Sequence, residues 1–221
     1  MPEQPQAISQ WFTTGTSVMK LYDLPPSPNA RRVRIFVAEK GLDIPIVPVD
    51  MMAGENQTEE YLAKNSLGKM PVLELDDGTC IAESSAICLY LEELHPDPPL
   101  LGSNALERAQ VNMWDRRMEL EFLIPLISIF VHTGEMWKGR VTQIPAMAEV
   151  LTKNIEDRMQ WLDKELQGKE FIAGDQYTVA DITAQCAFVL GKAALGVRIP
   201  ENLQNLSQWW QRVAARPTAR A

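Results

Sequence analysis

The first part of the chain alternates between short apolar segments and a segment of helical periodicity. Residues 19–23 and 44–49 are short and apolar, which predicts strands. Between them, residues 28–40 repeat their apolar side chains at helical spacing. A loop with a short helix is predicted at residues 54–64. A helix between two consecutive strands is typical of a parallel βαβ unit.

A hairpin and a further helix follow. Residues 72–75 and 79–82 flank the dipeptide Asp77-Gly78, which is typical of a tight hairpin turn. The next segment opens on Glu83 and continues with apolar side chains at helical spacing. The order of these elements predicts an α+β, thioredoxin-like domain over residues 19–95. Residues 1–18 are polar and lack periodicity, which indicates an extension before it.

The second half of the chain is helical in pattern. Prolines mark residues 96–102 as a linker, and residues 103–221 predict an all-helical domain. Within it, Pro125 should kink or break the first helix. Thr178 and Asp181 have the spacing of a capping box before a buried helix, so we assign them to folding. The predicted helices cover residues 103–133, 145–167, a segment from 178, and 203–215.

Composition narrows the possible functions. The formal charge is −8, and no basic patch large enough for nucleic acid is present. The short arginine cluster at residues 31–34 is expected on a solvated helix face. Three cysteines without a CxxC pair and two histidines argue against a disulfide framework or a metal site. The longest apolar run, residues 122–131, is too short to span a membrane, and no signal sequence is visible. We therefore expect a cytoplasmic protein.

Two short segments have the chemistry of a peptide-binding site. Met70-Pro71 precedes the hairpin, where the Met70 backbone could pair with an extended peptide if the bond is cis. Glu83 and Ser84 offer a carboxylate and a hydroxyl in front of free helix N–H groups. Together they could hold a peptide backbone together with its terminal amine and carboxylate.

Ser27 opens the first helix and admits two interpretations. A serine followed by Pro28 is an ordinary helix start. The same hydroxyl could donate a hydrogen bond to a thiolate, which the helix N-terminus also favours. The residues alone do not decide between the two.

Three motifs resemble the cytosolic glutathione transferases. They are Gly68-Lys69-Met70-Pro71-Val72-Leu73, Glu83-Ser84-x-Ala86-Ile87, and the segment at residues 171–181. The resemblance implies a cis bond at Pro71, glutathione as co-substrate and no metal. Met70 would bind the cysteinyl backbone, and Glu83 and Ser84 the γ-glutamyl end. Ser27 stands where theta-like and many bacterial members carry a catalytic serine, whereas Asn29 resembles the nu-like members, so the two are alternatives for thiol activation.

The resemblance implies further contacts. Asn56 and Gln57 fall where relatives bind the glycine carboxylate, and Lys69 could act there electrostatically. The electrophile pocket is expected between Ser27 and the long helix of the second domain. Its candidate residues are Met113, Trp114, Arg117 and His132. Asn56, Gln57 and Lys69 are equally consistent with exposed loop positions. For the pocket candidates the structural alternative is the commoner one, because a Met and aromatic stripe at helical spacing is more often core and a lone histidine more often structural.

The implied function is conjugation of glutathione to a small, largely apolar electrophile, as in detoxification, by a twofold-symmetric homodimer. In that dimer the first domain of one subunit faces the second domain of its partner. The alternatives are glutathione-dependent disulfide reduction of the nu-like kind and a non-catalytic interaction module. The presence of Ser27, Met70-Pro71, Glu83 and Ser84 argues against the latter.

Overall fold

The first domain is built on a four-stranded mixed sheet. The computed structural model describes residues 19–221, so the predicted extension at residues 1–18 lies outside the described residues. The strand order is β2-β1-β3-β4, with β1 and β2 parallel and the other neighbours antiparallel. The predicted thioredoxin-like arrangement is confirmed. The strands are β1 (Lys20–Asp23), β2 (Ile46–Pro48), β3 (Val72–Glu74) and β4 (Cys80–Ala82).

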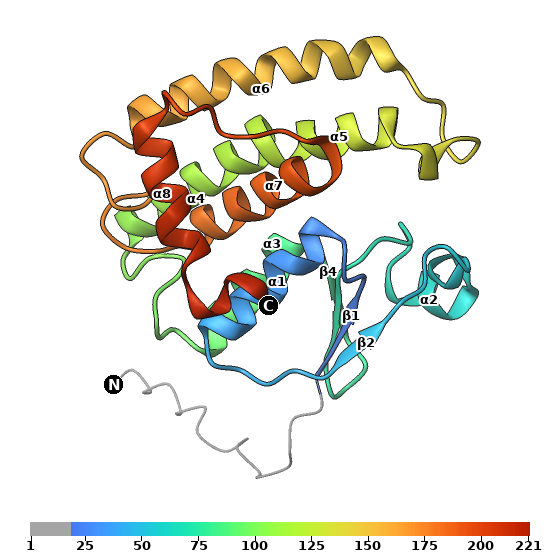
Figure 1. Ribbon diagram of the computed structural model, residues 1–221. Coiled ribbons are helices and arrows are strands. Elements are labelled where there is room, and N and C mark those ends of the chain that lie inside the picture. Colours follow the sequence, from blue (N-terminus) through green and yellow to red (C-terminus); the bar gives the residue numbers. More distant parts are fainter. Residues whose placement is uncertain (1–18) are drawn as a thin grey trace, which may run out of the picture.

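Helices cover both faces of this sheet (Figure 1). On one side lie α1 (Pro28–Glu39) and α3 (Ser84–Leu94), packed against Leu21 and Leu73 of the strands. On the other side, α2 (Glu59–Lys64) follows a 3₁₀ turn at Glu55–Gln57. The alternation of side chains along the strands sends Leu73 to the first face and Val72 to the second.

The second domain is all-helical, as predicted, and lies against α1 and α3 (Figure 1). Its most buried helix is α7, which packs on α1 of the first domain. Among the described residues, no helix is both long and apolar enough to cross a membrane. The helices are α4 (Ala105–Met118), α5 (Ile124–Thr133), α6 (Pro145–Glu165), α7 (Val179–Leu195) and α8 (Gln204–Ala214).

The expected disturbance at Pro125 takes the form of a wider helical turn. Between α4 and α5 the backbone makes a π-helical turn at Glu119–Leu123, and the Ile124 N–H donates to the Glu119 carbonyl. Proline has no N–H, and its ring would collide with the carbonyl of residue i−4 in a regular α-helix. The wider turn accommodates Pro125 without ending the helix.

A single apolar core joins the two domains. It extends from Leu21 in β1, through α1 and α3, to Trp209 and Val213 in α8. The end of the chain also returns to the first domain, where Arg216 forms an ion pair with Glu39 of α1. The sheet, α1 and the helical domain therefore form one packed unit.

The predicted capping box at the start of α7 is confirmed. One oxygen of Asp181 accepts hydrogen bonds from the Thr178 N–H and hydroxyl, at 3.0 and 3.2 Å. The other accepts from the Ile172 N–H at 2.9 Å and from the Trp209 indole at 2.8 Å. Asp181 is fully buried, so one carboxylate satisfies donors from a loop, α7 and α8.

We expect Asp181→Asn to lower the free energy of unfolding by about 2–4 kcal/mol, because the amide NH₂ would face buried donors and leave them unsatisfied. Urea denaturation measures this change. Asp175→Asn, at an exposed position of the same segment, is the control and should be nearly neutral. Equal stabilities of the two variants would contradict the proposed role of Asp181.

Candidate functional site

The predicted site segments meet at one end of the sheet. Tyr22 of β1 pairs with Val72 of β3, which also pairs with Ala82 of β4. Continuing both antiparallel ladders by two residues brings the segment after β1, Met70 and Ser84 to the same edge. The loop to α1, the segment before β3 and the start of α3 are therefore neighbours in the fold.

Ser27 caps α1 at this edge. Its hydroxyl oxygen accepts a hydrogen bond from the Ala30 N–H at 3.4 Å. The hydroxyl proton remains available to a ligand. Asn29, in the first turn of the same helix, is half-buried, and its side chain makes no hydrogen bond with any other described residue. Both candidates for thiol activation thus stand at the N-terminus of α1.

The arginines of α1 are not on a solvated face, and that prediction is wrong. Arg34 donates to both carboxylate oxygens of Asp23, at 2.6 and 2.8 Å. Arg31 donates to the carbonyl of Ala219 at 2.7 Å. Arg32 is completely buried. The first two contacts attach α1 to the end of β1 and to the C-terminal segment.

The loop before Met70 is held by side chains from its neighbours. The Asn56 amide donates to the carbonyl of Gly68 at 2.8 Å. The carbonyl of Lys69 accepts from the Tyr61 hydroxyl at 3.0 Å and from the Asn65 amide at 2.8 Å. Neither Tyr61 nor Asn65 was among the predicted site residues, although Asn65 stands beside the Gly68–Leu73 motif. These bonds fix the backbone immediately before Met70.

The three residues expected at the glycine carboxylate differ in environment. Asn56 is buried and committed to Gly68, so it positions the loop instead of pointing to solvent. Gln57 and Lys69 are exposed. The Gln57 side chain covers Gly68, because a Cβ built there would lie 2.5 Å from its Nε2. Of these three residues, only Gln57 and Lys69 are therefore accessible to a ligand carboxylate.

Met70 and Glu83 have the backbone features of a specialised site. The Met70-Pro71 peptide bond is cis, as expected. The Met70 side chain is buried beside Val49 and Tyr61 on the α2 face of the sheet. Glu83 has φ +69°, an uncommon conformation for a residue with a Cβ. Its side chain is exposed and has no hydrogen-bond or ion-pair partner in residues 19–221.

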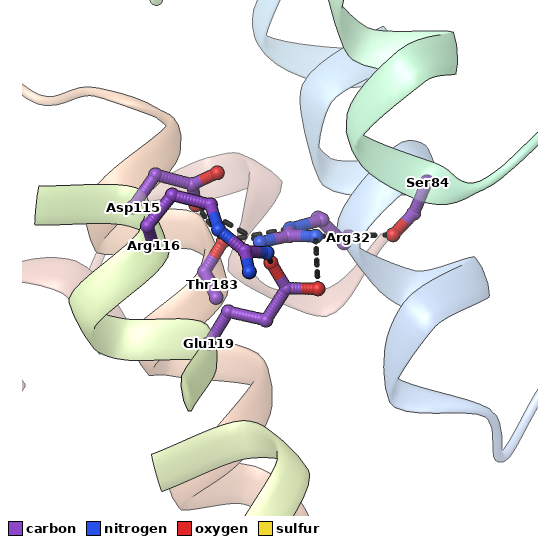
Figure 2. Close-up of polar contacts among 6 residues, drawn as sticks. All are labelled: Arg32, Ser84, Asp115, Arg116, Glu119 and Thr183. Carbon is purple, nitrogen blue, oxygen red and sulfur yellow. Dashed lines mark hydrogen bonds and ion pairs between the residues drawn. The ribbon is translucent and has the colours of Figure 1, made fainter. Parts of the chain in front are cut away.

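Ser84, next to Glu83, belongs to a buried polar cluster that spans the domains (Figure 2). Its hydroxyl oxygen accepts from Arg32 Nη1 at 3.1 Å. The same guanidinium donates to Asp115 at 2.9 Å and to the Thr183 hydroxyl at 2.7 Å. Burial acts to lower the pKa of Arg32, but its anionic neighbours, chiefly Asp115, outweigh burial and raise that pKa. Arg32 is therefore a permanent buried cation.

The cysteines are not positioned as nucleophiles at this site. Cys80, Cys88 and Cys186 are all free. Burial raises the pKa of Cys88 and Cys186 well above the ordinary value of a thiol. Residues 19–221 also contain no group of three potential metal ligands. A thiol reacting at Ser27 would therefore have to come from a ligand.

Two of the predicted electrophile-pocket residues make ring contacts within the helical domain. Trp114 stacks on Trp161 of α6, with ring centroids 5.8 Å apart. The Arg117 guanidinium lies 4.7 Å from the centre of the Trp114 ring. The stacking of the two rings joins α4 to α6 within the helical domain. The place of both residues in a pocket with Ser27 stays a prediction.

The other two pocket candidates lie on α4 and α5. Met113 is exposed on α4. His132, in the last turn of α5, accepts a hydrogen bond from the Ile144 N–H at 3.2 Å. Cavities of about 220 and 450 Å³ lie beside α6, the first lined by Arg117 and Trp161, the second by residues of α6 and the α7–α8 loop. Neither cavity is lined by residues of the first domain.

Comparison with known families decides the identity of this arrangement. Residues 17–93 match the family model described as "Glutathione S-transferase, N-terminal domain". Residues 122–217 match "Glutathione S-transferase, C-terminal domain". The chain belongs to the glutathione S-transferase family. The predicted family, fold and enzyme class are thereby confirmed.

Individual members of the glutathione S-transferase family agree over most of the chain. Glutathione S-transferase 2 of Saccharomyces cerevisiae is 34% identical over 207 residues, which are 91% of this chain and 88% of the relative. The crystal structure of Gtt2 from the same organism has a TM-score of 0.85 and 34% identity, covering 90% and 98% of the two chains. A glutathione S-transferase domain-containing protein from Marinobacter aquaeolei VT8 has a TM-score of 0.85 and 40% identity, covering 90% and 99%.

The packing around Gly68 gives a direct test of the loop before Met70. Gly68 and Gly78 both have positive φ, but only Gly68 is crowded: its Cβ would also lie 2.8 Å from the main-chain oxygen of Asn56, whereas nothing lies within 4 Å at Gly78. We expect Gly78→Ala to cost about 1 kcal/mol of unfolding free energy for the left-handed conformation alone.

Gly68→Ala should cost at least about 1 kcal/mol more than that, because the loop must also move. Urea denaturation of both variants gives the difference. Equal losses would show that Gly68 is not pressed against the loop at Asn56.

Proposed function

We propose that this protein ionises the thiol of glutathione at the N-terminus of α1 for attack on a small, largely apolar electrophile. The observation that carries the proposal is the hydrogen bonding of the Ser27 hydroxyl. Its oxygen is engaged by the Ala30 N–H, so its proton is free to donate. It also stands at the edge where Met70, Glu83 and Ser84 meet.

The energies required for this ionisation are modest. A free thiol with a pKa near 8.5 is mostly protonated at neutral pH, and each unit of depression corresponds to about 1.4 kcal/mol. A hydrogen bond to a charged group contributes roughly 1.5–3 kcal/mol. One donor at Ser27, supported by the α1 helix dipole, is therefore sufficient to make thiolate the major form. Asn29 is the alternative donor at the same helix end.

The rest of the tripeptide has matching partners in this proposal. Glu83 carries an unpaired carboxylate, which suits the amine of the γ-glutamyl group. Ser84 and the free N–H groups at the start of α3 suit its carboxylate. The Met70 backbone would pair with the cysteinyl unit. Gln57 and Lys69, both exposed, are the accessible groups for the glycine carboxylate.

We expect Ser27→Ala to raise the pKa of the bound thiol by about one to two and to slow conjugation near neutral pH by about tenfold or more. Ultraviolet absorption of the thiolate during a pH titration of the complex measures the first effect. Conjugation of an aromatic halide measures the second.

Ser27→Asp is the matched control for this prediction. Aspartate also caps a helix, so α1 should stay stable, but an ionised carboxylate offers no proton to the sulfur. An unchanged thiolate titration in Ser27→Ala would move the donor role to Asn29. Preference for a small dialkyl disulfide over the aromatic halide would favour the disulfide reductase.

The proposed homodimer is supported by an apolar stripe on α4 and the π-helical turn that follows it. Leu106, Met113 and Leu120 recur every seven residues and are 68%, 41% and 48% exposed. Leu89 on α3 of the first domain is also exposed. Exposed apolar rows of this kind are typical of helices that have a partner. A twofold dimer that places the first domain of one subunit against the second domain of the other would cover both surfaces.

We expect Met113→Glu to convert the dimer to monomer, because it would bury two charges in an apolar contact. Sedimentation velocity measures the change. Val150→Glu, at an exposed apolar residue of α6, is the control and should leave the dimer intact. A monomeric parent protein would contradict the dimer outright.

A further inference from the structure

The Arg32 guanidinium is a buried cation with partners in both domains (Figure 2). Its side chain has no exposed surface. It donates to Ser84 of α3 in the first domain, and to Asp115 of α4 and Thr183 of α7 in the second. Glu119 lies 3.7 Å away and is shared with Arg116. Removing such a cation from water is costly unless its donors are paired, and here three of its nitrogens are.

The contact with Ser84 determines where the hydroxyl proton of that residue can point. A serine oxygen carries one proton and two lone pairs. Arg32 Nη1, at 3.1 Å, directs an N–H to a lone pair of Ser84. Because the guanidinium accepts no hydrogen bond, the Ser84 proton must point away from it. Ser84 donates no hydrogen bond to any residue in 19–221, so an acceptor from a ligand at the start of α3 would make use of this proton.

We infer that Arg32 is a positioning residue, which orients the Ser84 hydroxyl as a donor to the γ-glutamyl carboxylate of glutathione. This inference rests on the proposed function. Arg32 is buried and does not touch the ligand itself. The cationic donor also polarises the hydroxyl, which makes Ser84 a better donor to an anion.

The anchors of Arg32 make the helical domain part of this arrangement. Asp115 and Thr183 are bonded to each other as well as to the guanidinium. They hold the planar group in one orientation from two helices of the second domain. The glutathione carboxylate therefore depends on residues that lie across the domain boundary from its binding site.

A double-mutant cycle tests this role. Calorimetry gives the dissociation constant of glutathione for the parent protein, Ser84→Ala, Arg32→Lys and the double variant. We expect Ser84→Ala to weaken binding roughly 10- to 100-fold. Lysine keeps the charge but cannot reach three partners at once. Arg32→Lys should therefore weaken binding about fivefold when Ser84 is present, and less than about twofold when it is added to the Ser84→Ala variant.

Two further readouts separate positioning from a general loss of structure. Arg32→Lys should raise KM for glutathione while kcat at saturating glutathione and the pKa of the bound thiol stay unchanged. A tripeptide in which γ-aminobutyrate replaces the γ-glutamyl group lacks the carboxylate, so its affinity should be the same in parent and Arg32→Lys.

The outcomes distinguish this inference from the proposed function. No binding of glutathione by the parent protein would overturn the proposed function. Binding that is unaffected by Ser84→Ala would overturn the ligand orientation. A loss caused by Arg32→Lys that is equally large in the parent protein and in the Ser84→Ala variant would overturn only the role of Arg32.

A milder substitution answers the question if Arg32→Lys does not fold. Thr183→Val has nearly the same shape but removes the acceptor of Arg32 Nε. Thr183→Ser keeps the hydroxyl and is the matched control. We expect Thr183→Val to weaken glutathione binding when Ser84 is present but not in the Ser84→Ala variant. Thr183→Ser should not weaken it. Equal affinities of the two variants would contradict the inference.

Discussion

The structure depends on the ion pair between Arg32 and Asp115, which is buried where the two domains meet. Because a buried guanidinium loses its water, the pair adds little net stability, but removing one partner costs about 3–5 kcal/mol. The pair instead determines geometry. The planar guanidinium of Arg32 can donate to all its partners only when α1, α3, α4 and α7 are in one arrangement. The apolar core around it supplies the bulk of the stabilisation.

The position of α1 sets both ends of the proposed glutathione site, because each end is in contact with this helix. Ser27 caps it, and Arg32 follows five residues later, about 7.5 Å further along the axis. The thiol end would thus be set by the N-terminus of α1, and the carboxylate end by the contact of α1 with Ser84. Asn56, Tyr61 and Asn65 hold the Met70 loop between them. The proposed site therefore combines two helix N-termini with a loop that is held by hydrogen bonds.

Local sequence signals predicted the fold well and the polar contacts poorly. The capping box at Thr178 and the tight turn at Asp77-Gly78 were readable because both partners are neighbours in sequence. Arg32 was wrongly predicted to be exposed because the prediction relied on its charge and not on its position in the helix. It lies three and four residues before buried Ile35 and Phe36, on the core side of α1. Its partner Asp115 is 83 residues away, so no local pattern marks the pair. The stacking of Trp114 on Trp161 likewise joins residues far apart in sequence, so no local pattern marks it.

We propose that one edge of the sheet holds glutathione with its sulfur at α1 and its γ-glutamyl carboxylate at α3. A crystal structure of the protein with glutathione measures both positions at once. The account predicts the sulfur within hydrogen-bond distance of Ser27 Oγ or the Asn29 amide, and the carboxylate on Ser84 at the start of α3. A sulfur pointing away from both residues, or an empty edge at millimolar glutathione, would contradict it.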